Sequence, residues 1–322
     1  MHGWSGFQEG CTEMVSGFDN SKLSVCLAGI PLKNPIMTAS GTFGFGKEAS
    51  TLYDINKLGA VVIKGVTKEP RLGNPLPRIT DCPSGLLNSI GLENPGIYSV
   101  IAHELPALRQ LYDHVIVSNV CGFSIDEFED VASQFDASPY VAMHEVNISC
   151  PNVKHGGMVF GVDPNAAAAI TRAIKLVTKK PIFIKLSPNV TDIVSIAKAC
   201  EAEGADGLTL INTILGMRIN LRTKKPILGN VFGGLSGPAV LPVALRMIFQ
   251  VYEAVKIPII GVGGVSSARD VVEMMLAGAT AVQVGSANLV DCHTCTNIID
   301  MLPDIMAELG VINISDIIGA AH

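Results

Sequence analysis

One cysteine in this chain is placed where a side chain could react. The segment at 145–152, EVNISCPN, carries an apolar, β-type run into Cys150, with Asn147 and Asn152 on either side. A glycine-bearing stretch, HGG at 155–157, follows it. A thiol at a strand end beside carboxamide groups is placed for chemistry, whereas free cysteines are often buried packing residues. The segment alone leaves both interpretations open.

Two lysines also end strongly apolar runs, Lys64 after AVVI and Lys185 after IFI. A buried lysine needs an anionic partner, because otherwise its pKa falls and it loses its charge. One fitting chemistry is a Schiff-base aldolase, with a lysine as nucleophile. The other is a flavin site, where a lysine stabilises negative charge on the reduced ring. Asparagines nearby favour the flavin, since carboxamides match the alternating N–H and C=O edge of a pyrimidine or flavin ring.

Two glycine-containing turns follow apolar segments late in the chain, GVGG at 261–264 and Gly285-Ser286. Glycines allow backbone N–H groups to approach an anion closely, and paired turns of this kind commonly bind phosphate in α/β barrels. Ordinary tight turns are the alternative interpretation. The two turns together favour phosphate.

The elements that must position these groups repeat regularly. Eight apolar, β-branched runs lie at 35–40, 60–67, 115–120, 145–150, 181–187, 207–213, 257–264 and 281–287. Helical segments are expected between them, including 164–178 after Asp163, 191–203 before Gly204 and 267–277 before Gly278. Near-continuous apolar strands indicate a parallel sheet buried on both faces. Eight such units of similar length predict an α/β fold, a (β/α)8 barrel, rather than an open doubly wound sheet.

The chemistry of a barrel enzyme lies at the carboxyl ends of its strands. Polar residues close one run after another here, and they are costly to bury without partners. They are Ser40, Gly41, Lys64, Gly65, Asn119, Asn147, Cys150, Lys185, Asn212, Thr213, Gly263, Gly264, Gly285 and Ser286. Two long connections, 68–95 and 214–238, interrupt the pattern, and loops of this length are usually functional. We therefore expect a ligand site on this rim.

Composition excludes several classes of function. The net charge of −6, without a basic stripe, argues against nucleic acid as a partner. No apolar run approaches the roughly 20 residues that span a bilayer. Eight irregularly spaced cysteines do not form a disulfide framework, which favours a reducing cytoplasm. The pair Cys292 and Cys295 is interpreted as coincidence at a helix start, with a redox pair as the alternative.

Ordered motifs along most of the chain resemble those of the dihydroorotate dehydrogenases. They are ASG at 39–41, GNP at 73–75 with PR at 77–78, NSIGL at 88–92, NISCPN at 147–152, KLSPN at 185–189, INT at 211–213, GGLSG at 233–237 and GVGG at 261–264. The resemblance begins near Leu23. It leaves residues 1–22 as an N-terminal extension, expected to be loosely ordered, and makes 23–322 the FMN-binding barrel domain.

Cys150 stands where the soluble class 1 enzymes of the family keep their base, whereas the membrane-associated class has serine there. The stretches PNVKHGG at 151–157 and INTILG at 211–216 resemble class 1B, the NAD-linked type, more than the fumarate-using class 1A. The resemblance implies oxidation of (S)-dihydroorotate to orotate in pyrimidine synthesis. FMN would take the hydride from C6, and Cys150 the proton from C5. A thiol with a reference pKa of about 8.5 serves as a base if its thiolate is modestly favoured.

The resemblance also implies which residues bind. The substrate would contact Lys64, Asn88, Ser89, Ile90, Gly91, Leu92, Asn147, Asn212 and Thr213. FMN would contact Ser40, Gly41, Lys64, Gly65, Asn119, Asn147, Lys185 and Ile211, with its phosphate end at Gly237, Gly263, Gly264, Gly285 and Ser286. No metal site is expected.

A partner is implied as well. The chain has no Rossmann fingerprint for NAD and no four-cysteine cluster motif. Electrons bound for NAD must therefore leave through another chain. The resemblance implies a subunit carrying FAD and a 2Fe-2S cluster, in a heterotetramer built around a homodimer of this chain.

Three rival activities remain open from sequence. The first is a fumarate-linked class 1A enzyme, and the second is another FMN barrel such as a dihydropyrimidine dehydrogenase-like enzyme. A dihydrouridine synthase-like barrel would need a basic RNA-binding surface, which this acidic chain lacks. The third is the Schiff-base aldolase on Lys64 or Lys185.

Overall fold

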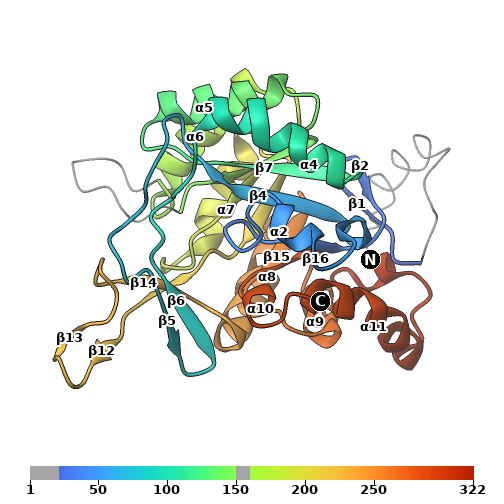
Figure 1. Ribbon diagram of the computed structural model, residues 1–322. Helices are drawn as coiled ribbons and strands as arrows, with labels where there is room; N and C mark the ends of the chain where they lie inside the picture. The colour runs from blue at the N-terminus through green and yellow to red at the C-terminus, as the bar shows by residue number, and fades with distance from the viewer. Residues whose placement is uncertain (1–21, 150–159) are drawn as a thin grey trace.

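A closed barrel of eight parallel strands forms the centre of the protein (Figure 1). The computed structural model describes residues 22–149 and 160–322. The barrel order is β10-β15-β16-β3-β4-β7-β8-β9. Its strands are β3 (Ile36–Thr38), β4 (Ala60–Val66), β7 (Val115–Val120), β8 (Met143–Asn147), β9 (Ile182–Lys185), β10 (Gly207–Leu210), β15 (Ile259–Val262) and β16 (Ala279–Val284). The predicted (β/α)8 barrel is confirmed.

The barrel strands are buried on both faces, as their near-continuous apolar sequences require. Every residue of β9, β10, β15 and β16 is buried. The predicted positions are confirmed with two shifts toward the N-terminus. β8 covers 143–147 instead of 145–150. The last strand covers 279–284 instead of 281–287, so Gly285 and Ser286 lie in the turn that follows it.

Helices surround the barrel as an outer layer (Figure 1). The α-helices are α2 (Lys47–Ser50), α3 (Ile97–Ser99), α4 (Leu105–Leu111), α5 (Ile125–Ala137), α6 (Pro164–Val177), α7 (Ile193–Ala202), α8 (Leu241–Tyr252), α9 (Ala268–Leu276), α10 (Ala287–Val290) and α11 (Thr294–Leu309). Short turns of other helix types are η1 (Ile55–Lys57), η2 (Val100–Glu104), η3 (Pro238–Val240) and η4 (Ile314–Ile317).

Side-chain caps start the three helices that the sequence predicts most clearly. Asp163 accepts a hydrogen bond from the backbone N–H of Asn165 at the start of α6. At the start of α7, Asp192 accepts hydrogen bonds from the backbone N–H groups of Val194 and Ser195. At α9, Ser267 forms a capping box with Asp270. These acceptors satisfy N–H groups that the first helical turn leaves unpaired.

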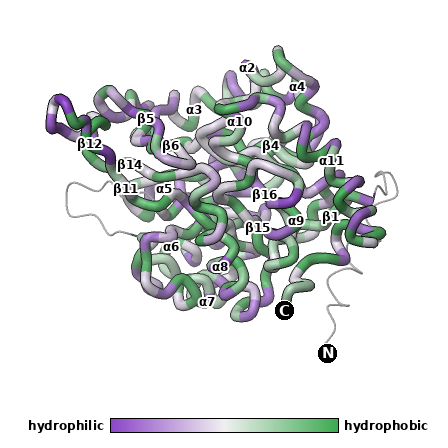
Figure 2. The backbone as a smooth tube through the Cα atoms, turned by 90° about the horizontal axis from the view of Figure 1, so that it is seen from below, coloured by the Kyte–Doolittle hydropathy of each residue, from purple (hydrophilic) through white to green (hydrophobic). Residues whose placement is uncertain are grey.

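The two long connections are not irregular loops. They pair into an antiparallel sheet of order β11-β14-β6-β5, made of β5 (Ile79–Cys82), β6 (Gly85–Asn88), β11 (Ile214–Gly216) and β14 (Gly233–Ser236). A small hairpin, β12 (Ile219–Asn220) with β13 (Lys225–Pro226), extends from it, and its tip is hydrophilic (Figure 2). A second hairpin, β1 (Val25–Leu27) with β2 (Ile30–Leu32), lies near the N-terminus. The sequence predicts none of these three antiparallel pairings.

Two expectations concern the outside of the fold. The predicted extension at 1–22 lies outside the described residues except for Lys22, so its division from the barrel stays a prediction. Within the described part of the chain, no helix has both the length and the apolar character needed to cross a bilayer.

Candidate functional site

A cavity of about 630 Å³ opens at the carboxyl ends of the barrel strands. All the described residues that the sequence places at the site line it. They are Ser40, Gly41, Lys64, Gly65, Asn88, Ser89, Ile90, Gly91, Leu92, Asn119, Asn147, Lys185, Ile211, Asn212, Thr213, Gly237, Gly263, Gly264, Gly285 and Ser286. Cys150 lies outside the described residues, although Ser149, which precedes it, lines the cavity.

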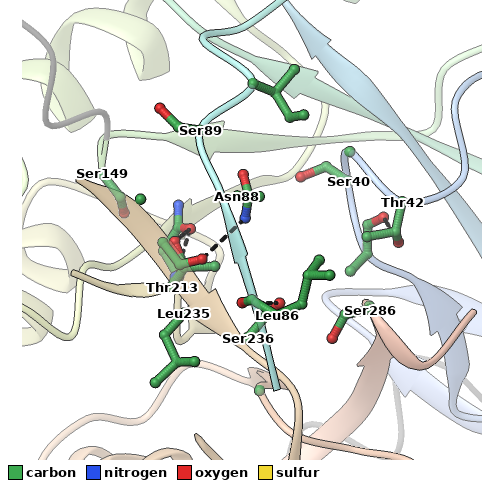
Figure 3. Close-up of a pocket in the computed structure, with 18 of the residues that line it drawn as sticks. Ser40, Thr42, Leu86, Asn88, Ser89, Ser149, Thr213, Leu235, Ser236 and Ser286 are labelled. Carbon is green, nitrogen blue, oxygen red and sulfur yellow. Dashed lines mark hydrogen bonds between the residues drawn. The ribbon is translucent and has the colours of Figure 1, made fainter. Parts of the chain in front are cut away.

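The small antiparallel sheet forms one wall of this cavity. Figure 3 shows Leu86 and Asn88 on β6, between Thr213 on one side and Ser40 on the other. Asn88 is held there by its Nδ2 atom, which donates to the carbonyl of Gly234 on β14 at 3.3 Å. The long connections therefore matter because they carry side chains over the mouth of the barrel.

The asparagines at the strand ends are oriented by each other. The Oδ1 atom of Asn147 accepts hydrogen bonds from Asn212 Nδ2 at 3.2 Å and from the backbone N–H of Ser149 at 3.2 Å. The backbone N–H of Thr213 donates to Asn212 Oδ1 at 2.7 Å. Among the described residues, none accepts a hydrogen bond from Asn147 Nδ2. That N–H2 group is therefore available to a ligand in the cavity.

The two lysines of the cavity have different surroundings. Lys185 is 4% exposed, and its Nζ lies 3.1 Å from Glu145 Oε1 and 3.3 Å from Gln283 Oε1. Lys64 is half-buried, and no described residue pairs with its ammonium. The cavity is thus lined by one lysine with a carboxylate partner, Lys185, and by one without a described partner, Lys64.

Glu145 and Gln283 are the residues that sequence reasoning missed. Both are fully buried, and Gln283 Nε2 donates to Glu145 Oε2. Asn119 Nδ2 donates to Glu145 Oε1 at 2.7 Å. The available signal was a charged or amide side chain inside an otherwise apolar strand, which cannot be buried without partners. Glu145 and Gln283 lie within their strands, whereas the sequence-predicted site residues lie at the strand ends and in the loops after them.

Glycines shape the side of the cavity near α8 and α10. Gly264 has φ +83°, and a Cβ atom there would lie 2.5 Å from the backbone nitrogen of Leu241. Gly263 and Gly237 also have positive φ angles, of +130° and +104°. L-residues rarely adopt this conformation, so glycine is required for both backbone geometry and space. Ser286, at the start of α10, makes no capping hydrogen bond with its side chain, so its hydroxyl remains available to a ligand.

The Cys292 and Cys295 pair does not belong to this cavity. α11 begins at Thr294, between the two cysteines. Cys295 is buried and donates to Asn288 Oδ1 at 3.3 Å. Burial raises the pKa of its thiol to about 12, which disfavours the reactive thiolate. In the ranges 22–149 and 160–322, no three His, Cys, Asp or Glu side chains form a metal-binding group.

A Ser–His–Asp arrangement also occurs away from the cavity. His144 Nδ1 lies 2.8 Å from Ser118 Oγ, and its Nε2 lies 3.3 Å from Asp136 Oδ1. Ser118 and His144 are fully buried, and neither lines the cavity. Burial lowers the pKa of His144 to about 4, against the opposing effect of Asp136. A substrate has no access to this serine, so the arrangement is structural.

Comparison with known proteins gives one consistent result. The dihydroorotate dehydrogenase family model matches residues 22–306. The catalytic subunit of dihydroorotate dehydrogenase B (NAD(+)) from a Geobacillus species is 55% identical over 299 residues, which are 93% of this chain and 95% of that protein. The corresponding subunit from Listeria welshimeri is 55% identical over 297 residues, 92% of this chain and 97% of that protein.

A solved structure supports the fold separately. The structure of DHODH from Eimeria tenella in complex with ferulenol superposes with a TM-score of 0.80. It covers 95% of this chain and 90% of that chain at 22% sequence identity. At that identity the likeness establishes the barrel architecture alone.

Proposed function

The chain belongs to the dihydroorotate dehydrogenase family, whose reaction is the oxidation of dihydroorotate to orotate in pyrimidine synthesis, and we propose that this reaction takes place in the cavity at the barrel mouth. The observation that carries the proposal is the joint presence there of three features: an ammonium on Lys64 and an amide N–H2 on Asn147, neither of which has a partner among the described residues, and a wall of glycine backbone. These groups match an anionic pyrimidine beside a phosphate-bearing cofactor.

FMN fits the residues that are present. The glycine wall at 263–264, with Gly285 and Ser286, would hold the phosphate through backbone N–H groups and a hydroxyl. Lys185 and Asn119, at the floor, would contact the ring system. When bound, FMN supplies the acceptor for a hydride. The other groups of the cavity bind and orient the two reactants.

The substrate would lie between the strand ends and the small sheet. Lys64 would pair with its carboxylate, because no described residue neutralises that ammonium. Asn147 would donate its free N–H2 to a ring carbonyl, while Asn88 and Ser89 would close the site from the β6 side. A ligand with a carboxylate gains a charge-assisted contact with Lys64, which a neutral pyrimidine lacks. This arrangement favours dihydroorotate over dihydrouracil.

Cys150 is the proposed base. Its assignment rests on the NISCPN motif, since the residue itself lies outside the described ranges. The thiolate of Cys150 would take the proton from C5 of the substrate while C6 gives up a hydride, for which bound FMN would supply the acceptor. Losing the proton and the hydride would leave the ring with a double bond between C5 and C6.

The electrons would then leave through a second protein. The relatives are named as NAD(+)-linked catalytic subunits, which implies a partner subunit. We propose that this partner carries FAD and a 2Fe-2S cluster and that two copies of each chain assemble as a heterotetramer. We place the enzyme in the cytoplasm. In support, five of the six described cysteines are free thiols, namely Cys82, Cys121, Cys200, Cys292 and Cys295. The sixth, Cys26, is disulfide-bonded, which is not predicted from the sequence.

An anaerobic absorbance spectrum tests the proposal. The purified chain, loaded with FMN, should show a flavin band that bleaches when (S)-dihydroorotate is added. Dihydrouracil serves as the control, and it should leave the band unchanged. Bleaching by dihydrouracil alone would instead establish a dihydropyrimidine dehydrogenase-like enzyme. Efficient reoxidation by fumarate without a partner would contradict the NAD-linked assignment.

A further inference from the structure

One carboxylate connects three strands beneath the floor of the cavity. Glu145 on β8 accepts hydrogen bonds from Asn119 on β7, Lys185 on β9 and Gln283 on β16. Glu145 does not line the cavity, whereas Asn119 and Lys185 do. The carboxylate therefore reaches a ligand only through the side chains that it holds.

These hydrogen bonds fix the orientation of each partner. A carboxylate only accepts, so Gln283 must turn its Nε2 toward Glu145 and its Oε1 toward Lys185. Asn119 likewise turns its Nδ2 toward Glu145, which leaves its Oδ1 to accept from Cys121 Sγ at 3.3 Å. The polarity of the cavity floor thus depends on one buried charge.

The charge balance of the cavity follows from the same geometry. Lys64 and Lys185 are the cationic side chains among the described lining residues, and no acidic side chain lines the cavity. Lys185 and Glu145 form an ion pair of 3.1 Å with side chains 5% and 0% exposed. A ligand in the cavity experiences this ion pair as a dipole. The electric field of a dipole falls with distance faster than the field of a single charge. Lys64 has no such counter-ion in the described part of the chain.

We propose that Glu145 is a positioning residue that holds Lys185 in a charge-neutral pair, so that Lys185 acts on the flavin as an oriented hydrogen-bond donor and Lys64 supplies the net positive charge of the cavity. This division of roles between the two lysines rests on the proposed function, because it concerns how the cavity meets FMN and the substrate carboxylate.

The reduction potential of bound FMN measures the proposed balance. Two-electron reduction adds negative charge to the flavin, so a more positive surrounding raises the potential. Potentials would be measured anaerobically against reference dyes for the FMN-loaded full chain, with every variant at the same pH. Glu145→Gln should raise the potential, because Lys185 then stands uncompensated. Lys185→Gln should lower the potential, because the negative charge of Glu145 then stands uncompensated.

The double variant Glu145→Gln/Lys185→Gln is the decisive case. It removes both charges and should return the potential close to that of the original protein. Lys64→Gln should lower the potential in both the original and the double-variant background. The matched control is Glu203→Gln, which breaks an ion pair with Arg172 on the outer helices and should leave the potential unchanged. Equal potentials for the original protein and Glu145→Gln, or a double variant that differs as much as the single variants, would overturn the proposal.

Thermal unfolding of the FMN-free chain tests the pair without the cofactor. Either single variant leaves one buried charge unpaired, so each should melt at a lower temperature than the double variant. A double variant no more stable than the single variants would contradict the neutral pair. Failure of the proposed function looks different. In that case the original protein binds no FMN, or dihydroorotate does not reduce it, while the order of melting temperatures remains as expected.

Discussion

The side chain of Asn212 donates a hydrogen bond to Asn147 Oδ1 at 3.2 Å, joining the ends of β10 and β8 across β9. The two residues are 65 positions apart in the chain. The bond uses the oxygen of Asn147 and leaves its N–H2 without an acceptor among the described residues. In the proposed function, the orientation of this substrate-binding group therefore depends on a contact between two protein side chains.

Asn212→Asp should weaken substrate binding. The new carboxylate cannot donate to Asn147, and its charge repels the carboxylate of dihydroorotate. Losing a hydrogen bond and adding repulsion should cost about 1–3 kcal/mol, which is a rise in KM of roughly 5- to 150-fold. Steady-state kinetics measure this rise. Asn165→Asp, the same change on the exposed first turn of α6, should leave KM unchanged.

Lys64→Gln should weaken binding of the product orotate. The variant keeps a polar side chain but removes the cation that no described residue neutralises. A hydrogen bond to a charged group contributes about 1.5–3 kcal/mol, so the Kd should rise at least about tenfold. Perturbation of the flavin spectrum by orotate reports the Kd. Lys57→Gln, at an exposed ion pair with Asp300, is the control. An unchanged Kd for Lys64→Gln would remove this lysine from the substrate site.

Gly264→Ala should reduce both FMN affinity and stability. Its φ of +83° disfavours alanine, and the new Cβ would lie 2.5 Å from Leu241 N. Strain of this kind costs on the order of 1–3 kcal/mol. Gly29→Ala is a matched control with φ +82° and no atom within 4 Å of the new Cβ. Fluorescence titration with FMN and thermal melts should show the larger loss for Gly264→Ala. Equal losses would mean that close packing at the glycine wall is unimportant.

Stability should fall as the pH is lowered from about 6.5 toward 4. Burial lowers the pKa of His144 to about 4 in the folded protein, against an ordinary value of 6.5. In this window the unfolded chain binds a proton that the folded chain does not, so acid favours unfolding. The full effect is roughly 3 kcal/mol. Below this window, Asp136 adds to the loss. Burial raises the pKa of Asp136, but the hydrogen bonds that its carboxylate accepts from the backbone of Lys179 and Lys180 and from His144 outweigh burial and lower it. The stability that Asp136 contributes is therefore lost as the folded carboxylate is protonated.

His144→Gln should flatten this pH dependence, since glutamine does not titrate. Urea unfolding at pH 7, 6 and 5 measures the slope. His103→Gln, at an exposed position, should keep the slope of the original protein. A slope that persists in His144→Gln would assign the acid sensitivity to other groups.

The sequence by itself determined the barrel and most of the rim. Runs such as 207–213 and 257–264 are apolar because both faces of a parallel strand are buried, and that pattern is local. Capping residues such as Asp163 and Ser267 are equally local, since a helix start needs a side-chain acceptor within a few residues. Strand order in a (β/α)8 barrel then brings the strand ends together, so Lys64, Asn147 and Lys185 could be placed at one site.

Only the tertiary structure decided which residues meet. Connections 68–95 and 214–238 pair into one sheet, although neither contains a strand pattern strong enough to identify its partner. Glu145 and Gln283 lie 138 positions apart and become neighbours only because the barrel closes and its register turns both side chains inward. A polar residue within an apolar strand signals that a partner exists. The identity of that partner depends on closure and register, which are set by packing across the whole barrel.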